Sequence, residues 1–273
     1  MQKLSKSRIV FVGLTCGSLL SLVAFRSQHE RAHAGGSPSV SSSRTSQLPP
    51  TILWAWERPE RLGFINPAKV GVAFLAKTVY LRGDRVVSRP RLQPLGLSPG
   101  TPLIAVARIE SEHSSNSAKR PTLSGAQITE TVATISELGS LPNVLMVQVD
   151  FDAMISERAF YRELLIQLRN KLPQSTAVSI TALASWCKGD NWLQDLPVDE
   201  AVPMLFRMGV ERKQFLSQLA AGEGFSAKPC QTSAGVSTDE PLALSLPIQR
   251  LYVFNPRVWS PESLDQVMET YKR

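Results

Sequence analysis

The chain has 273 residues, of which 43% are hydrophobic, and it carries a formal net charge of +7. This length allows one large domain or two small ones with a sizeable core. The charge is uneven, because residues 1–50 hold six basic residues and one acidic residue, whereas the remainder holds 24 and 22. The body is therefore nearly neutral and has no basic stripe interleaved with aromatic residues, which argues against a nucleic-acid partner.

The N-terminus predicts export. Three basic residues among the first eight precede an uncharged apolar run at 9–25, and small residues follow at 32–34. This pattern makes residues 1–34 either a cleaved signal peptide or an uncleaved signal anchor that holds the protein to a membrane through residues 9–25. We expect a periplasmic protein, or a membrane-anchored one whose body faces the periplasm or the cell exterior.

A linker and a series of alternating elements follow. Residues 35–50 are rich in Gly, Ser and Pro and predict a flexible linker, so the fold should begin near Thr51. In chain order, we predict strands at 51–57, 69–81 and 102–110, a helix at 123–139, a strand at 144–150, a helix at 156–171, strands at 176–185 and 200–208, a helix at 211–221, strands at 230–238 and 249–256, and a closing helix from 260. The weakest are 230–238 and 200–208, the latter because Pro203 cannot donate to a strand ladder.

Eight strands separated mostly by helices or loops predict a single α/β domain at 51–273, a (β/α)8 TIM-like barrel. The alternative is an open doubly wound sheet. That fold favours a glycine-rich turn after its first strand, and the chain has neither a G-x-G-x-x-G sequence nor a P-loop.

Polar and aromatic residues gather where the predicted strands end, which is where barrels of this class carry their chemistry. The strand starts are far blander. The candidate residues are Trp54, Trp56, Glu57, Arg108, Glu110, Asp150, Asp152, Trp186, Arg207, Asp239, Glu240 and Asn255.

Two of these candidates follow the apolar run at 144–149. Asp150 and Asp152 are two positions apart, so they share one face of the strand while Phe151 points to the other. If that face is inward, Asp150 is the deeper group that holds its neighbour, and Asp152 lies at the floor of a pocket. The alternative is that both carboxylates pair with arginines and only organise the barrel.

The remaining residue types narrow the chemistry. Only His113 among the three histidines lies in the body, which argues against a Ser-His-Asp or Cys-His hydrolase and against a histidine-based zinc site. We expect no metal and no cofactor, and the alternative is a cation bound only by oxygen atoms of the carboxylates. Catalysis is left mainly to Asp and Glu. All five tryptophans lie at or just after predicted strand ends, which modestly favours a sugar ligand over an ordinary packed rim.

Two cysteines, Cys187 and Cys230, lie in the body. In an exported chain they are compatible with a disulfide, and the alternative is a pair of unrelated buried thiols.

Several stretches between residues 53 and 260 resemble a bacterial family defined only as domain of unknown function three-one-four-two. The matching stretches are "WAWERPE", "GVAFLA", "LSPGTPLIAVARIE", "DFDA", "SERAFY", "SITALASWC", "PVDEAVPMLFRMG" and "YVFNPRVWS". The resemblance implies a barrel similar to those of glycoside hydrolases.

Two glycosidase patterns can be compared with the chain. Asp150 and Asp152 match the inner acids of the chitinase-like D-x-x-D-x-D-x-E strand, but Met154 stands where that pattern has its catalytic Glu. In retaining glycosidases the acid and the nucleophile follow strands four and seven, where this chain has Asp152 and either Asp239 or Glu240.

These observations support two functions almost equally. The first is an exported glycoside hydrolase in which Asp152 is the general acid, Glu240 or Asp239 is the nucleophile or base, and Asp150 adjusts the acid. The second is a non-catalytic barrel that binds an oligo- or polysaccharide or acts as an envelope scaffold. In both, the expected contacts to the ligand come from Trp54, Trp56, Glu57, Arg108, Glu110, Trp186, Arg207 and Asn255.

Overall fold

The computed structural model describes residues 44–114, 116, 119–242 and 247–272. The predicted signal or anchor segment at 1–34 and most of the predicted linker lie outside the described residues. Within the described ranges, no helix is both long enough and apolar enough to cross a membrane.

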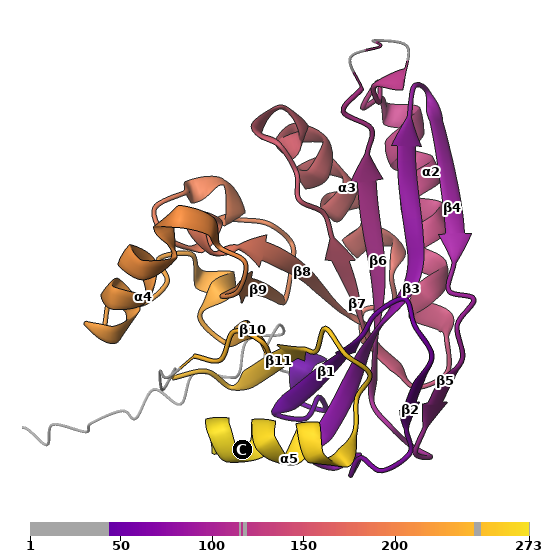
Figure 1. The fold of residues 1–273 in the computed structure, drawn as a ribbon. Coiled ribbons are helices and arrows are strands. Elements are labelled where there is room, and N and C mark those ends of the chain that lie inside the picture. Colours follow the sequence, from indigo (N-terminus) through magenta and orange to yellow (C-terminus); the bar gives the residue numbers. More distant parts are fainter. Residues whose placement is uncertain (1–43, 115, 117–118, 243–246, 273) are drawn as a thin grey trace, which may run out of the picture. The chain divides into compact units, whose positions relative to one another are not determined.

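Eight parallel strands of the described chain close into a barrel (Figure 1). They are β1 (Thr51–Ala55), β3 (Val70–Arg82), β6 (Leu103–Ser111), β7 (Val144–Asp150), β8 (Ala177–Leu183), β9 (Glu200–Met204), β10 (Ser233–Ser237) and β11 (Arg250–Phe254). Each strand pairs with the next in this order, and β1 closes the ring by pairing with both β3 and β11. The predicted α/β, TIM-like barrel is confirmed.

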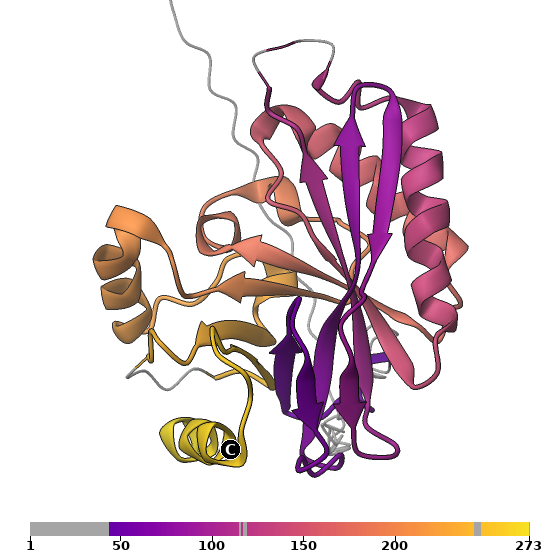
Figure 2. The same cartoon turned by 45° about the vertical axis from the view of Figure 1, so that its right-hand side comes forward.

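Helices occupy only some of the connections. They are α2 (Gly125–Ser136) after β6, α3 (Arg158–Lys171) after β7, α4 (Arg212–Ala220) after β9 and α5 (Pro261–Tyr271) after β11. Three short strands, which the sequence did not predict, lie in the connections before β6: β2 (Glu60–Leu62), β4 (Arg85–Pro90) and β5 (Leu95–Leu97). Strand β4 pairs antiparallel with the C-terminal half of β3. The strands β3, β4 and β6 extend beyond the end of β7 and lie beside α2 (Figure 2).

The barrel interior contains alternate residues from each strand. Its apolar cluster includes Ile52 and Trp54 from β1, Ile104 and Val106 from β6, and Tyr252 from β11. A larger cluster fills the space between the strands and the surrounding helices. This alternation follows from the pleat of a strand, since successive side chains point to opposite faces.

The folded domain begins before Thr51, which corrects the predicted linker boundary. Leu48 is buried in the interior cluster. Arg44 forms an ion pair with Asp199, and the carbonyl of Thr45 accepts a hydrogen bond from Arg250 at 2.9 Å. Residues 44–50 therefore pack against the amino end of the barrel.

A disulfide joins Cys187, just after β8, to Cys230, just before β10. Their Cα atoms are 5.8 Å apart, within the usual range for such a bond. The predicted pairing is confirmed, and it is compatible with export.

Candidate functional site

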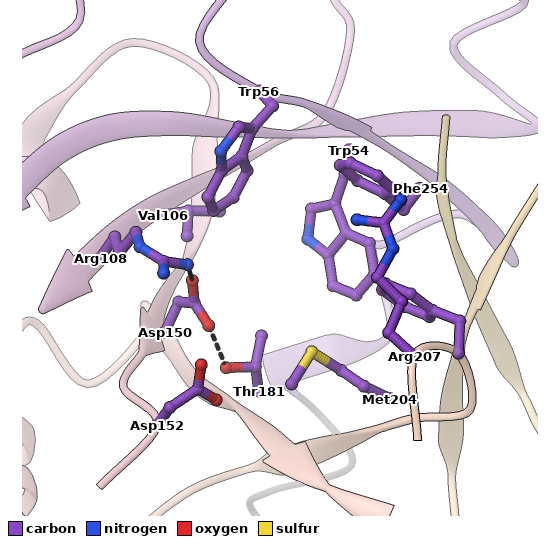
Figure 3. Close-up of a pocket in the computed structure, with 11 residues that line it drawn as sticks. Trp54, Trp56, Val106, Arg108, Asp150, Asp152, Thr181, Met204, Arg207 and Phe254 are labelled. Carbon is purple, nitrogen blue, oxygen red and sulfur yellow. Dashed lines mark hydrogen bonds and ion pairs between the residues drawn. The ribbon is translucent and has the colours of Figure 1, made fainter. Parts of the chain in front are cut away.

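A pocket of about 180 Å³ lies at the carboxyl end of the barrel (Figure 3). Its walls come from β1, β6, β7, β8, β9 and β11 and from the residues that follow them. The lining residues are Trp54, Trp56, Val106, Arg108, Asp150, Asp152, Thr181, Met204, Phe206, Arg207 and Phe254. The pocket is at the end of the barrel where the sequence predicted it.

One side of this pocket is aromatic. The rings of Phe206 and Phe254 are stacked, with centroids 5.7 Å apart and an interplanar angle of 1°. Trp54 meets Phe206 edge-on at 6.3 Å, and Figure 3 shows Trp54 and Phe254 on the same side of the cavity. These rings give the pocket a broad apolar surface.

The facing side is polar and is organised by Asp150 (Figure 3). Arg108 Nη1 donates to Asp150 Oδ2 at 2.9 Å, and Thr181 Oγ1 donates to Oδ1 at 2.6 Å. Asp150 is only 6% exposed, so both of its oxygens are engaged inside the barrel end. Asp150 is thus the more buried of the two aspartates. The predicted alternative paired both carboxylates with arginines, and the structure pairs Asp150 with Arg108.

Asp152 lines the same pocket without a hydrogen bond or ion pair to any described residue. Although its side chain reaches solvent, burial against the pocket walls raises the pKa of Asp152. The negative charge of Asp150 raises this pKa further, and Arg108 opposes both effects. A carboxyl with a raised pKa is the kind of group that general acid catalysis requires.

Phe151 confirms the expected alternation at the end of β7. Its ring is buried on the outer side of the barrel and packs edge-on against Tyr161, with centroids 5.2 Å apart. The two aspartates therefore face the pocket because Phe151 faces the helical layer.

A buried hydrogen-bonded layer beneath the pocket fixes Trp54. The indole Nε1 of Trp54 donates to Gln148 Oε1 at 3.0 Å, and Gln148 Nε2 donates to Ser179 Oγ at 3.1 Å. Because all three side chains are buried, these bonds hold the orientation of Trp54.

The amino end of the barrel contains charges that the sequence reading did not anticipate. Glu200 and Arg250, the first residues of β9 and β11, form a buried ion pair. The hydroxyl of Tyr252 donates to the same Glu200 carboxylate. The expectation of bland strand starts was wrong for β9 and β11, and the charged first residue of each of these two strands was the available signal.

Two arginines hold the backbone beside the pocket, Arg91 at the end of β1 and Arg58 at the residues that follow β11. Arg91 donates to the carbonyls of Ala55 at 3.2 Å, of Trp56, and of Arg58 at 2.6 Å. Arg58 in turn donates to the carbonyl of Pro256, just after β11, at 3.0 Å. Since Trp56 lies beyond the last residue of β1, these bonds fix the backbone that carries it.

Asp239 and Glu240 do not line the pocket with Asp152. Both oxygens of Glu240 accept the backbone N–H of Arg207, at 3.2 and 3.1 Å, and Oε2 also accepts from Arg212. Asp239 accepts a hydrogen bond from the hydroxyl of Ser237, which lowers the pKa of Asp239. We expected Asp152 to face Asp239 or Glu240 across one cavity, and the structure does not place either residue in the pocket with Asp152.

Four other candidates also lie outside the pocket lining. Trp186 is 4% exposed and packs edge-on against Trp192, so it cannot stack on a ligand. Glu57 pairs with Arg89, and Glu110 pairs with Arg108 from the rim. Asn255 is buried and accepts from Thr238 Oγ1 at 2.9 Å.

Only part of the predicted set of site residues lines the pocket. These residues are Trp54, Trp56, Arg108, Asp150, Asp152 and Arg207. The lining residues that sequence reading missed are Val106, Thr181, Met204, Phe206 and Phe254. Apart from Phe206, these occupy positions within strands, and the inward alternation along each strand was the signal that could have found them.

Among the described residues, no group of three or more His, Cys, Asp or Glu side chains could hold a metal ion. Comparison of the chain with protein-family models, curated proteins and solved structures finds no significant match. The site must therefore be interpreted from its own geometry.

Proposed function

We propose that the carboxyl end of this barrel binds one sugar residue of an oligo- or polysaccharide. The observation that carries the proposal is the opposition of two walls, one aromatic and one built from Arg108, Asp150 and Thr181. A sugar ring presents apolar C–H groups on its faces and hydroxyls around its edge. It matches this arrangement, with its face against the rings and its hydroxyls toward the polar wall.

The pocket volume supports a single ring as the enclosed part of the ligand. About 180 Å³ lies below the roughly 300–1,000 Å³ of pockets for drug-sized ligands. A longer glycan would extend out of the pocket mouth.

The test is a titration of the purified full-length protein with a panel of plant and envelope glycans, alongside Trp56→Ala and Val258→Ala. We expect Trp56→Ala to lower the affinity at least tenfold, because it removes a pocket ring. Val258 is exposed after β11 and does not line the pocket, so its variant should bind as the parent does. Absence of glycan binding by the parent, or equal affinity of the two variants, would refute the proposal.

Glycoside hydrolysis is the second candidate, and Asp152 is the observation that favours it. Its raised pKa and lack of a described partner suit a proton donor to the leaving glycosidic oxygen. The second carboxylate that such chemistry needs is not free in the pocket, because Asp150 is engaged by Arg108 and Thr181. The geometry therefore favours binding over hydrolysis.

Mass spectrometry of sugars released by the parent and by Asp152→Asn separates the two candidates. Release by the parent and not by the variant would establish hydrolysis through Asp152. Retained binding by both proteins without release would leave the binding function alone.

We also propose that the protein works outside the cytoplasm, anchored through residues 9–25 if the N-terminal segment is not cleaved. The basic start, the apolar run and the disulfide support this. Cell fractionation that recovers the full-length protein with oxidised cysteines from the cytoplasm would refute it.

A further inference from the structure

Arg207 has an unusual backbone at the pocket. Its φ angle is +54°, in the left-handed region that side chains other than glycine adopt at a cost. Among the described non-glycine residues with positive φ, it alone lines the pocket. Such a conformation persists only when neighbouring contacts stabilise it.

Glu240 supplies that contact. Its two carboxylate oxygens accept the backbone N–H of Arg207 at 3.2 and 3.1 Å, and Arg212 Nη1 donates to Oε2 at 3.2 Å. The loop after β10 therefore holds the loop after β9 by a charged hydrogen bond to the strained residue.

The held backbone presents the guanidinium of Arg207 at the aromatic wall. Its Cζ atom lies 5.3 Å from the centroid of Phe254, and Figure 3 shows it opposite Asp150 and Asp152. Its ionic partner, Asp239, is 3.4 Å away, and the two side chains are 55% and 43% exposed. A pair this open is weak, so a ligand can replace Asp239.

The other guanidinium of the pocket is already committed. Arg108 donates to buried Asp150 at 2.9 Å and to Glu110 at 3.0 Å. Of the two pocket arginines, Arg207 is therefore the one whose guanidinium can bind an anionic group of a ligand.

We propose that Arg207 selects a sugar that carries a carboxylate, a uronic acid, and that Glu240 is the positioning residue that presents Arg207. This inference rests on the proposed sugar-binding function. The planar guanidinium can bind a carboxylate with two parallel hydrogen bonds. With the acid group at Arg207, the ring would lie along the aromatic wall and its hydroxyls would face the aspartates across the pocket.

The experiment uses matched acidic and neutral ligands. The purified full-length protein would be titrated calorimetrically with the methyl glycosides of glucuronate, galacturonate, glucose and galactose. We expect the acidic member of at least one pair to bind at least tenfold more tightly. Arg207→Ala should remove this preference while affinity for the neutral sugar stays within about threefold.

Two further variants test positioning. Arg207→Gly removes the guanidinium but tolerates positive φ, so it should lose the preference and unfold no more easily than the parent. Glu240→Ala should also lose the preference, and the double variant Arg207→Ala/Glu240→Ala should lose no more than Arg207→Ala alone. Glu223→Gln is the control, because this glutamate pairs on the surface with Lys188.

The outcomes separate the two proposals. Equal binding of acidic and neutral sugars, or a preference that survives Arg207→Ala, would overturn the inference and leave the sugar-binding function standing. A Glu240→Ala variant that weakens acidic and neutral sugars alike would show a structural role and overturn positioning. Binding of no glycan by the parent would overturn the proposed function and this inference with it.

Discussion

Gly235 of β10 lies against the indole ring of Trp54. A Cβ atom on Gly235 would come within 3.0 Å of Cη2 and 3.2 Å of Cζ3 of that ring. Both contacts are tighter than most Cβ contacts in proteins, and the hydrogen bond from the indole nitrogen to Gln148 opposes a shift of Trp54. The absence of a side chain at Gly235 is therefore what leaves room for the tryptophan at the pocket wall.

We predict that Gly235→Ala destabilises the protein by about 1–3 kcal/mol, because it overpacks the barrel interior. Urea denaturation measures the free energy of unfolding. Gly224→Ala is the control, since a Cβ there meets nothing within 4 Å. A Gly235→Ala variant as stable as the control would show that Trp54 moves freely.

Glu200→Gln should destabilise the protein by about 3–5 kcal/mol, since it leaves buried Arg250 without its charged partner. Tyr252→Phe, which loses one hydrogen bond to Glu200, should cost about 1 kcal/mol. Chemical denaturation of each variant measures its loss in free energy of unfolding. The comparison is Glu137→Gln, whose exposed pair with Lys77 should be worth less than about 1 kcal/mol. Equal losses at Glu200 and Glu137 would contradict a buried pair.

The barrel was predictable because its strands have strong sequence signals. The strand Val144–Asp150 has the predicted bounds, since an apolar run buried on both faces ends at a polar residue. Strand β9 forms despite Pro203, and its pairing with β10 is reduced to Met204 and Gly235. The hairpin strand β4 was missed because its residues are mostly exposed and carry no apolar pattern.

The site was only partly predictable because strand ends identify a face of the barrel but not the path of each loop. Trp56 and Trp186 both follow strands, yet a 3-10 turn, Ala184–Cys187, folds Trp186 into the core. Glu240 looked catalytic by position, whereas its carboxylate binds a backbone N–H of another loop. No pattern in the chain announces that long-range contact.

Removal of the disulfide should lower stability by about 4 kcal/mol. The bond closes a loop with a sequence separation of 43, for which the chain-entropy model gives about that value. The measurement compares denaturation of the parent with and without reductant. Cys187→Ser/Cys230→Ser should match the reduced parent and should not respond to reductant. A reductant effect on the double variant would assign the loss to another cause.

Asp152→Asn should make the protein more stable at neutral pH. Burial and the charge of Asp150 raise the pKa of Asp152 in the folded protein, so the folded state binds more protons than the unfolded chain between the two pKa values. Stability should therefore fall as the pH rises from the ordinary aspartate pKa through the folded value.

Asparagine removes this pH dependence, so the variant should be as stable as the parent at low pH. At neutral pH the variant should be more stable by less than about 1 kcal/mol, since the side chain of Asp152 is exposed. Urea denaturation across a pH series measures the difference, and a variant less stable than the parent at neutral pH would mean that the ionised Asp152 stabilises the fold.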